Sequence, residues 1–213
     1  MFMEMLFDDP PRFFMVLLVV VFSVCLHEFF HAWAAVSEGD ESLRDHLTLN
    51  PLKQMGVMSI IMFLFLGIAW GSVPVRKELL RSRKSELKVA ASGPFANLLL
   101  LLVSLFFFVL LLKWAGETPP ESARGVAQTR TLLFFVLTMG VYNFVLFVFN
   151  LLPVPGLDGW HILQYFFPGK LEIRSEWVKG IMAGMILGAF FLVPYLFQAG
   201  YFVMLKPAAM LLK

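Results

Sequence analysis

Long hydrophobic runs separated by short polar segments dominate the pattern along the chain. Four runs are long enough to cross the roughly 30 Å hydrocarbon core of a bilayer, which takes about 20 helical residues. They cover approximately residues 13–36, 89–113, 131–152 and 181–205. Pro194 lies in the middle of the last run and is expected to kink that helix. The pattern therefore predicts an all-α polytopic membrane protein with about four transmembrane helices.

A fifth apolar stretch, residues 55–75, carries no charge but is interrupted by glycines and by Pro74. Only about 13 of its residues, 57–69, have a clean helical pattern, and that length is typical of a re-entrant segment rather than a span. Residues 68–75 fit an extended strand better. We therefore expect a re-entrant element here, in which a helix enters the membrane and a strand returns without crossing it.

The composition supports a membrane protein with a single domain. The 213 residues are 59% hydrophobic and only 15% charged, against about 25% charged residues in soluble domains. The net charge of +2 is too small for a nucleic-acid-binding surface, and the single cysteine, Cys25, excludes an intrachain disulfide. We therefore interpret residues 1–213 as one domain embedded in the lipid bilayer, with no nucleic-acid partner.

The first hydrophobic run contains three ionisable residues within five positions, in the sequence His27-Glu28-Phe29-Phe30-His31. Residues i and i+4 share one helix face, so both imidazoles of this HExxH motif can bind a single Zn²⁺. Glu28 lies beside that face and can take a proton from water activated by the metal. Because ionisable groups inside a span are costly, the motif favours a functional site over polar residues that only pack against other helices.

A catalytic zinc site normally has three protein ligands and one open position, and Asp158 is the best third candidate. Pro153 and Pro155 precede it and should unwind the end of the third long run. Irregular backbone at membrane depth is tolerated where it lines a polar cavity. The alternative role for Asp158 is the N-cap of a helix that begins near Gly159. Beside the HExxH motif, the ligand role is favoured.

These two motifs together resemble those of a known family. HExxH in the first span and Asn-x-x-Pro-x-Pro-x-Leu-Asp-Gly at residues 150–159 look like the site-2 protease family of intramembrane zinc metalloproteases. The segments 47–53 and 92–97, which read LTLNPLK and SGPFAN, also resemble compact bacterial members. The resemblance covers about residues 23–165. We see no PDZ or CBS insertion, so regulation through such a domain is not expected.

The resemblance implies a zinc metalloendopeptidase that hydrolyses peptide bonds of transmembrane proteins or peptides. It implies one Zn²⁺ per chain, bound by His27, His31 and Asp158, with Glu28 as the catalytic base. Asn150 matches a polar group beside the metal, where its amide could stabilise the oxyanion or hold the substrate backbone. The alternative for Asn150 is a helix-packing hydrogen bond. No feature of the sequence specifies a particular substrate or an oligomeric state.

The metal site also restricts the topology. Its ligands lie near the ends of the runs 13–36 and 131–152, so these two helices must run parallel with one net crossing between them. The run 89–113 supplies that crossing, which requires residues 55–75 to be re-entrant.

Charge then orients the protein in the membrane. On this topology eleven of the 17 Lys and Arg residues share the active-site face, so that face should be cytoplasmic and the N-terminus outside. The eleven are Arg44, Lys53, Arg76, Lys77, Arg81, Arg83, Lys84, Lys88, Lys170, Arg174 and Lys179. The six on the opposite face are Arg12, Lys113, Arg124, Arg130, Lys206 and Lys213. By resemblance, we expect a multi-pass protein of the cell membrane.

A second hypothesis is a zinc-binding membrane protein without protease activity, such as a transporter or a sensor. A transporter should spread polar groups through several spans, whereas here they cluster near one metal site, which favours the enzyme. Two further residues have alternative roles: His161 beside the ligands or facing solvent, and Asn97 facing the site or satisfying a neighbouring helix.

Overall fold

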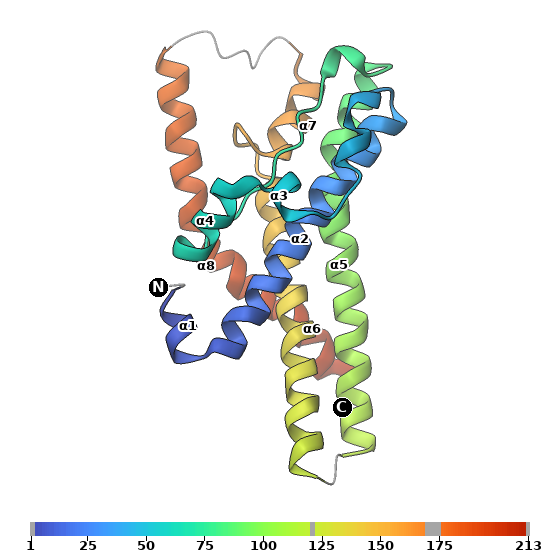
Figure 1. Cartoon of the computed structure of the whole chain (residues 1–213), viewed down its shortest axis with the longest axis vertical. Helices are drawn as coiled ribbons and strands as arrows, with labels where there is room; N and C mark the ends of the chain where they lie inside the picture. Colours follow the sequence, from blue (N-terminus) through green and yellow to red (C-terminus); the bar gives the residue numbers. More distant parts are fainter. Residues whose placement is uncertain (1–2, 120–121, 169–175, 212–213) are drawn as a thin grey trace.

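Four long helices form the body of the protein in the computed structural model, which describes residues 3–119, 122–168 and 176–211 (Figure 1). They are α2 (Pro10–Ser37), α5 (Arg83–Glu117), α6 (Ala123–Asn150) and α8 (Glu176–Leu211). Each contains a segment long and apolar enough to cross a membrane. The four predicted spans are therefore confirmed as helices. Pro194 lies inside α8, and Figure 1 shows that this helix bends part-way along its length.

Six short helical elements join or flank the long helices. They are α1 (Glu4–Asp8), η1 (Glu41–His46), α3 (Pro51–Gln54), α4 (Gly56–Leu66), η2 (Lys77–Leu79) and α7 (Asp158–Phe166). Figure 1 shows that α5 runs opposite to α2 and α6, and α5 packs against both of them. The C-terminal halves of α2 and α6 therefore point toward the same end of the molecule, as the predicted single crossing requires.

Local sequence accounts for the helix boundaries. The carboxylate of Asp9 accepts a hydrogen bond from Arg12 N at 3.2 Å at the start of α2, and Ser82 caps α5 in the same way through Ser85 N. Helix α6 ends at Asn150, just before Pro153 and Pro155, which cannot donate backbone hydrogen bonds. The predicted unwinding before Asp158 is therefore confirmed.

Of the three hydrophobic clusters among the described residues, two illustrate how the helices pack. One joins α2 to α4 through Val16, Val20, Val24 and Phe63, and the other joins α5, α6 and α8 through Leu101, Phe108, Val141 and Met204. A glycine on α6, Gly140, permits the second contact, because an added Cβ there would lie 2.3 Å from Met204 Sδ. Helix α5 also packs against α2, α6 and α7, so the helices that carry the site contact one another directly.

Residues 55–75 provide a correction. Helix α4 has 11 residues and ends at Gly67, which has a left-handed φ of 74°, but the expected strand at 68–75 is wrong, since the described part of the chain contains no strand. The backbone N–H and C=O of Trp70 bond instead to Ser59 Oγ, at 2.9 and 2.6 Å, and Ser72 N–H donates to Gln54 O. These backbone groups of Trp70 and Ser72 are therefore satisfied by residues close by in the sequence rather than by a strand partner. The re-entrant path itself stays a prediction.

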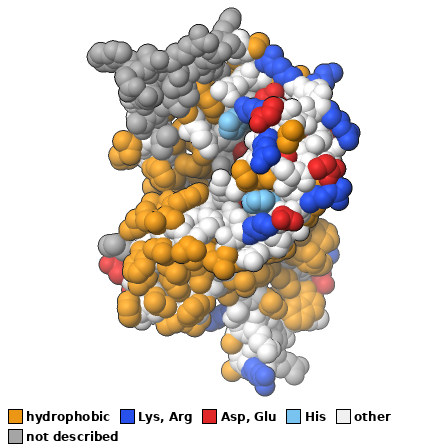
Figure 2. All heavy atoms as spheres, turned by 45° about the horizontal axis from the view of Figure 1, so that its top comes forward, with side chains coloured by type: hydrophobic (Ala, Val, Ile, Leu, Met, Phe, Trp, Pro, Cys, Tyr) orange, Lys and Arg blue, Asp and Glu red, His pale blue; other side chains and the backbone are white. Residues whose placement is uncertain are grey.

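Charge is unevenly distributed over the surface. On the face drawn in Figure 2, Lys, Arg, Asp and Glu side chains gather toward one end, and hydrophobic side chains cover most of the rest. Of the basic residues used to predict the orientation, Lys170, Arg174 and Lys213 lie outside the described residues, and the side chain of Lys179 is likewise not described. The observed separation is what a protein with an apolar belt in a bilayer requires.

Candidate active site

A cavity of about 390 Å³ lies between α2, α5, α6, α7 and residues 69–75. His27, Glu28 and His31 of α2 line it, together with Asp158 at the start of α7. All three α2 residues are buried, and the Asp158 side chain is 15% exposed. The two predicted motifs, about 120 residues apart in sequence, therefore meet in one cavity.

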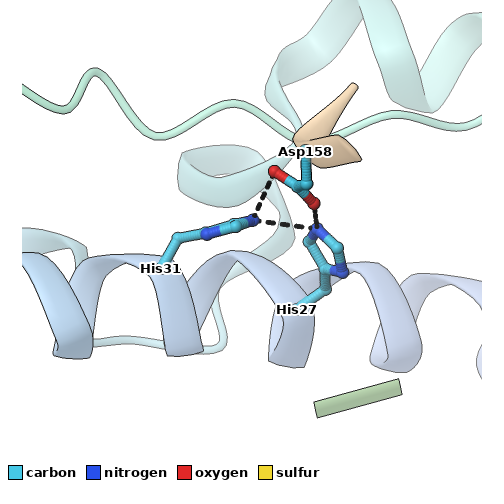
Figure 3. A group of neighbouring side chains, drawn as sticks. All are labelled: His27, His31 and Asp158. Atoms are coloured by element: carbon cyan, nitrogen blue, oxygen red, sulfur yellow. Dashed lines mark hydrogen bonds and ion pairs between the residues drawn. The ribbon is translucent and has the colours of Figure 1, made fainter. Parts of the chain in front are cut away.

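The three predicted metal ligands point toward one another (Figure 3). His27 Nε2 and His31 Nε2 are 3.0 Å apart, and the two Asp158 oxygens lie 3.0 Å from His27 Nε2 and 3.2 Å from His31 Nε2. One ligand atom from each residue fits within 4.8 Å of the others. The arrangement is that of two imidazoles and one carboxylate around a single position.

Hydrogen bonds behind the imidazoles determine which nitrogens face that position. His31 Nδ1 is 2.8 Å from the carbonyl oxygen of Val89, and His27 Nδ1 is 2.6 Å from Asn97 Oδ1. A proton on each Nδ1 would be donated to these oxygens and would leave the Nε2 lone pairs directed into the cavity.

These lone pairs make the donor set fit a cation. Two Nε2 atoms and a carboxylate face one another, and Asp158 Oδ2 is buried without a hydrogen bond of acceptable geometry. Two imidazoles and one ionised carboxylate match the ligands of catalytic zinc sites, and these residues would hold the ion.

Backbone packing leaves the room that an ion needs. Gly93 of α5 approaches the two histidines so closely that an added Cβ would lie 2.2 Å from His31 Nε2 and 2.5 Å from His27 Nε2. Any other residue at this position would fill the space in front of the ligands. The sequence identified Gly93 only as part of a family-like segment, and this contact explains why a glycine is required.

Asp158 does not cap α7, because the N-cap residue is Leu157 and no side chain caps that end. Of the two roles considered for Asp158, only the one beside the histidines is compatible with its position.

Helix α7 starts one residue earlier than expected. Its start packs closely against the end of α6, since an added Cβ at Gly159 would lie 2.2 Å from Leu151 O. Its other end is held by Arg83, which donates to the carbonyl oxygens of Gln164 and Tyr165.

Glu28 lies in the same cavity, beneath residues 69–75. An added Cβ at Gly71 would lie 2.2 Å from Glu28 Cγ and 2.3 Å from its Oε1. The backbone at Gly71 therefore covers the carboxylate directly. This contact restricts the positions that the Glu28 side chain can occupy beside the ligands.

The remaining candidates differ in their environment. Asn150 lines the cavity, and its Nδ2 donates to Leu146 O of its own helix at 3.0 Å. His161 also lines the cavity, although it is largely exposed, and partial burial together with the charge of Lys77 lowers its pKa. Asn97 performs both of its considered roles, since it faces His27 and also bonds to a neighbouring helix through Asn143.

Sequence reasoning missed Asn143. This residue is fully buried in α6 and reaches the site only through Asn97. Its one visible signal is an amide inside a hydrophobic run, which is costly unless it has partners.

Comparison with known proteins identifies the family. A family model described as peptidase family M50 matches residues 15–128 and 119–194. The chain belongs to this family, the site-2 proteases. No solved structure matches the chain.

Similar site-2 proteases occur in several bacteria. The chain is 31% identical over 191 residues to YwhC of Bacillus subtilis, covering 88% of this chain and 82% of YwhC. It is 34% identical over 163 residues to Rip2 of Mycolicibacterium smegmatis, covering 71% of this chain and 57% of that relative. Rip2 of Mycobacterium tuberculosis is also 34% identical. The names of all three include the words zinc metalloprotease. The chain is therefore a zinc metalloprotease.

Proposed function

We propose that this site-2 protease hydrolyses peptide bonds of membrane-spanning substrates, with one Zn²⁺ held by His27, His31 and Asp158. The convergence of these three ligands beside Glu28, in one cavity of a protein with four apolar helices, carries the proposal. A zinc ion held there would act as a Lewis acid, polarising the scissile carbonyl and making water a stronger acid.

The side chains in the cavity have separate roles. Glu28 accepts the proton of the attacking water and delivers it to the leaving amine, as a general base and then a general acid. Asn150 has a second amide N–H besides the one bonded to Leu146 O, and this N–H holds the substrate carbonyl or the developing oxyanion. An Asn150→Ala variant with full activity would contradict that role.

The substrate must enter in an extended conformation. Carbonyl groups inside a helix are hydrogen-bonded to the N–H four residues later, so a helical span hides its peptide bonds from Glu28. Local unwinding at the cavity exposes them. The substrate class is therefore a transmembrane protein or peptide with a segment that unwinds readily.

The proposed activity is tested by measuring zinc content and cleavage of a single-span model substrate in liposomes. We expect about one zinc per chain in both the wild type and Glu28→Gln, with cleavage reduced about 10²–10⁴-fold in the variant. The matched control is Glu86→Gln, which alters a carboxylate that also lines the cavity but forms an ion pair with Lys77. Full cleavage by Glu28→Gln would overturn the role of Glu28 as the general base. Wild-type protein that contains no zinc after purification would contradict the proposed zinc site.

We further propose that the active-site end faces the cytoplasm and the N-terminus lies outside. The excess of Lys and Arg at the active-site end supports this orientation. Lys84 is exposed at the start of α5, at the active-site end. Arg124 is exposed at the start of α6, at the opposite end of the molecule. In intact cells carrying Cys25→Ala, a membrane-impermeant maleimide should label Arg124→Cys but should label Lys84→Cys only after permeabilisation. The reverse labelling would contradict the orientation.

A further inference from the structure

A chain of buried hydrogen bonds leads from His27 into the interior between three helices. Asn97 Oδ1 on α5 lies 2.6 Å from His27 Nδ1, and Asn97 Nδ2 donates to Asn143 Oδ1 on α6 at 2.9 Å. Asn143 Nδ2 in turn donates to Ser23 Oγ on α2 at 2.9 Å and to Met139 O at 2.8 Å. Both asparagines and Ser23 are completely buried.

The last partner gives this chain a direction. Met139 O is a main-chain carbonyl oxygen and can only accept, so the Asn143 amide must turn its NH₂ group toward it. The opposite orientation would place two acceptor oxygens at hydrogen-bonding distance in a buried site, which is costly. Asn143 Oδ1 therefore faces Asn97, whose NH₂ group donates to it. Asn97 Oδ1 is then left facing His27, where it accepts the Nδ1 proton.

The tautomer of each histidine thus depends on a main-chain carbonyl group, which one ring reaches directly and the other indirectly. His31 Nδ1 reaches the carbonyl of Val89 directly, whereas His27 reaches the carbonyl of Met139 through two amides. We propose that Asn97 and Asn143 are positioning residues that keep His27 in the tautomer whose Nε2 lone pair faces the metal position, and that Asn143 acts only through Asn97. This inference rests on the proposed zinc site.

Zinc affinity distinguishes positioning from helix packing. Loss of an outer-shell partner of a ligand typically weakens metal binding about 10–100-fold. Two packing contacts that act independently would have additive effects, whereas two members of one hydrogen-bond chain would not. A double-mutant cycle on Asn97 and Asn143 therefore measures the proposed connection directly.

The experiment determines zinc dissociation constants by chelator competition for Asn97→Leu, Asn143→Leu and the double variant. We expect Asn97→Leu to weaken binding about 10–100-fold, Asn143→Leu about 10-fold, and the double variant no more than Asn97→Leu alone. Asn97→Asp, which keeps an oxygen facing His27, should bind much more tightly than Asn97→Leu. Ser104→Ala on α5 and Thr138→Val on α6 are matched controls, since both remove a buried hydroxyl and should leave affinity unchanged. Wild-type affinity in Asn143→Leu, or additive effects, would overturn the proposal.

A second measurement does not depend on zinc and separates this proposal from the proposed function. In the zinc-free full-length protein at alkaline pH, ¹⁵N NMR of the four histidines reports which ring nitrogen carries the proton. We expect His27 to be protonated at Nδ1 in the wild type and to become a mixture of tautomers in Asn143→Leu. An Nε2-protonated His27 in the wild type would overturn the proposal. Wild type that shows the expected tautomer but binds no zinc would overturn the proposed function instead.

Discussion

The histidine pair and Asp158 are positioned in different ways, although all three face one point. His27 and His31 lie four residues apart on one long helix, and each ring is hydrogen-bonded from behind by a buried group. Asp158 begins a helix of nine residues that follows an irregular turn, and its side chain is 15% exposed, against 8% for His27 and 9% for His31. Its buried Oδ2 has no hydrogen-bonding partner behind it.

Because of this difference, substitutions will disturb the histidine half of the site (His27 and His31) and the aspartate half (Asp158) unequally. The histidine half is held by helical spacing and by contacts between α2, α5 and α6, so only changes inside that packing can disturb it. The aspartate half depends on how α7 rests against α6 at one end and against Arg83 at the other. Substitutions at glycines and at Arg83 can test the two halves separately.

The largest effect is expected from Gly93→Ala in the histidine half. Its Cβ would lie 2.2 Å from His31 Nε2 and would occupy the space in front of both imidazoles. Zinc content and cleavage should both be lost, a larger effect than the about 10–100-fold of an outer-shell change. Helix stability should not suffer, because alanine is favoured over glycine in helices by about 1 kcal/mol.

The control for this substitution is Gly116→Ala, on the same helix but with nothing within 4 Å of the added Cβ. It should retain zinc and activity. Wild-type zinc content in Gly93→Ala, measured by elemental analysis, would show that the described packing around the histidines is incorrect.

A smaller effect is expected from Gly159→Ala in the aspartate half. The added Cβ would lie 2.2 Å from Leu151 O and 2.5 Å from Leu152 O, so the start of α7 must shift at a cost of about 1–3 kcal/mol. Moving Asp158 should weaken zinc binding about 10-fold or more, by analogy with outer-shell changes, without altering the His27 tautomer. Chelator competition and ¹⁵N NMR measure these outcomes, with Gly188→Ala as the control without neighbours. An altered His27 tautomer would mean that the two halves are not independent.

The smallest effect is expected from Arg83→Ala, which acts at the far end of α7. Arg83 donates to two carbonyl oxygens at that end and lies over the Tyr165 ring. A cation at a helix C-terminus contributes about 0.3–1 kcal/mol, so cleavage should fall about two- to fivefold. Lys84→Ala removes the same charge from the next, exposed residue and should leave cleavage unchanged. Equal losses in both variants would indicate a general charge effect rather than positioning of α7.

Much of this architecture could be predicted because its signals are local. Bilayer thickness makes long apolar runs recognisable as spans, and the helical repeat places residues 27 and 31 on one face. The prolines before Asp158 cannot continue a helix, so the unwound turn was also predictable. The absence of a strand at 68–75 was not predictable, because backbone groups of Trp70 and Ser72 bond to Ser59 and Gln54, close by in the sequence. A pattern of residue types does not reveal such partners.

The sequence by itself determined the membrane helices, the histidine pair with its adjacent glutamate, and Asp158 as the candidate third ligand. Each depends on spacing along one helix or on residues that interrupt one. Only the tertiary structure decided how closely Gly93 and Gly71 approach the site and which carbonyl groups control the imidazole tautomers. Those features depend on atoms of different helices meeting within a few ångströms, and such distances arise only when the helices pack together.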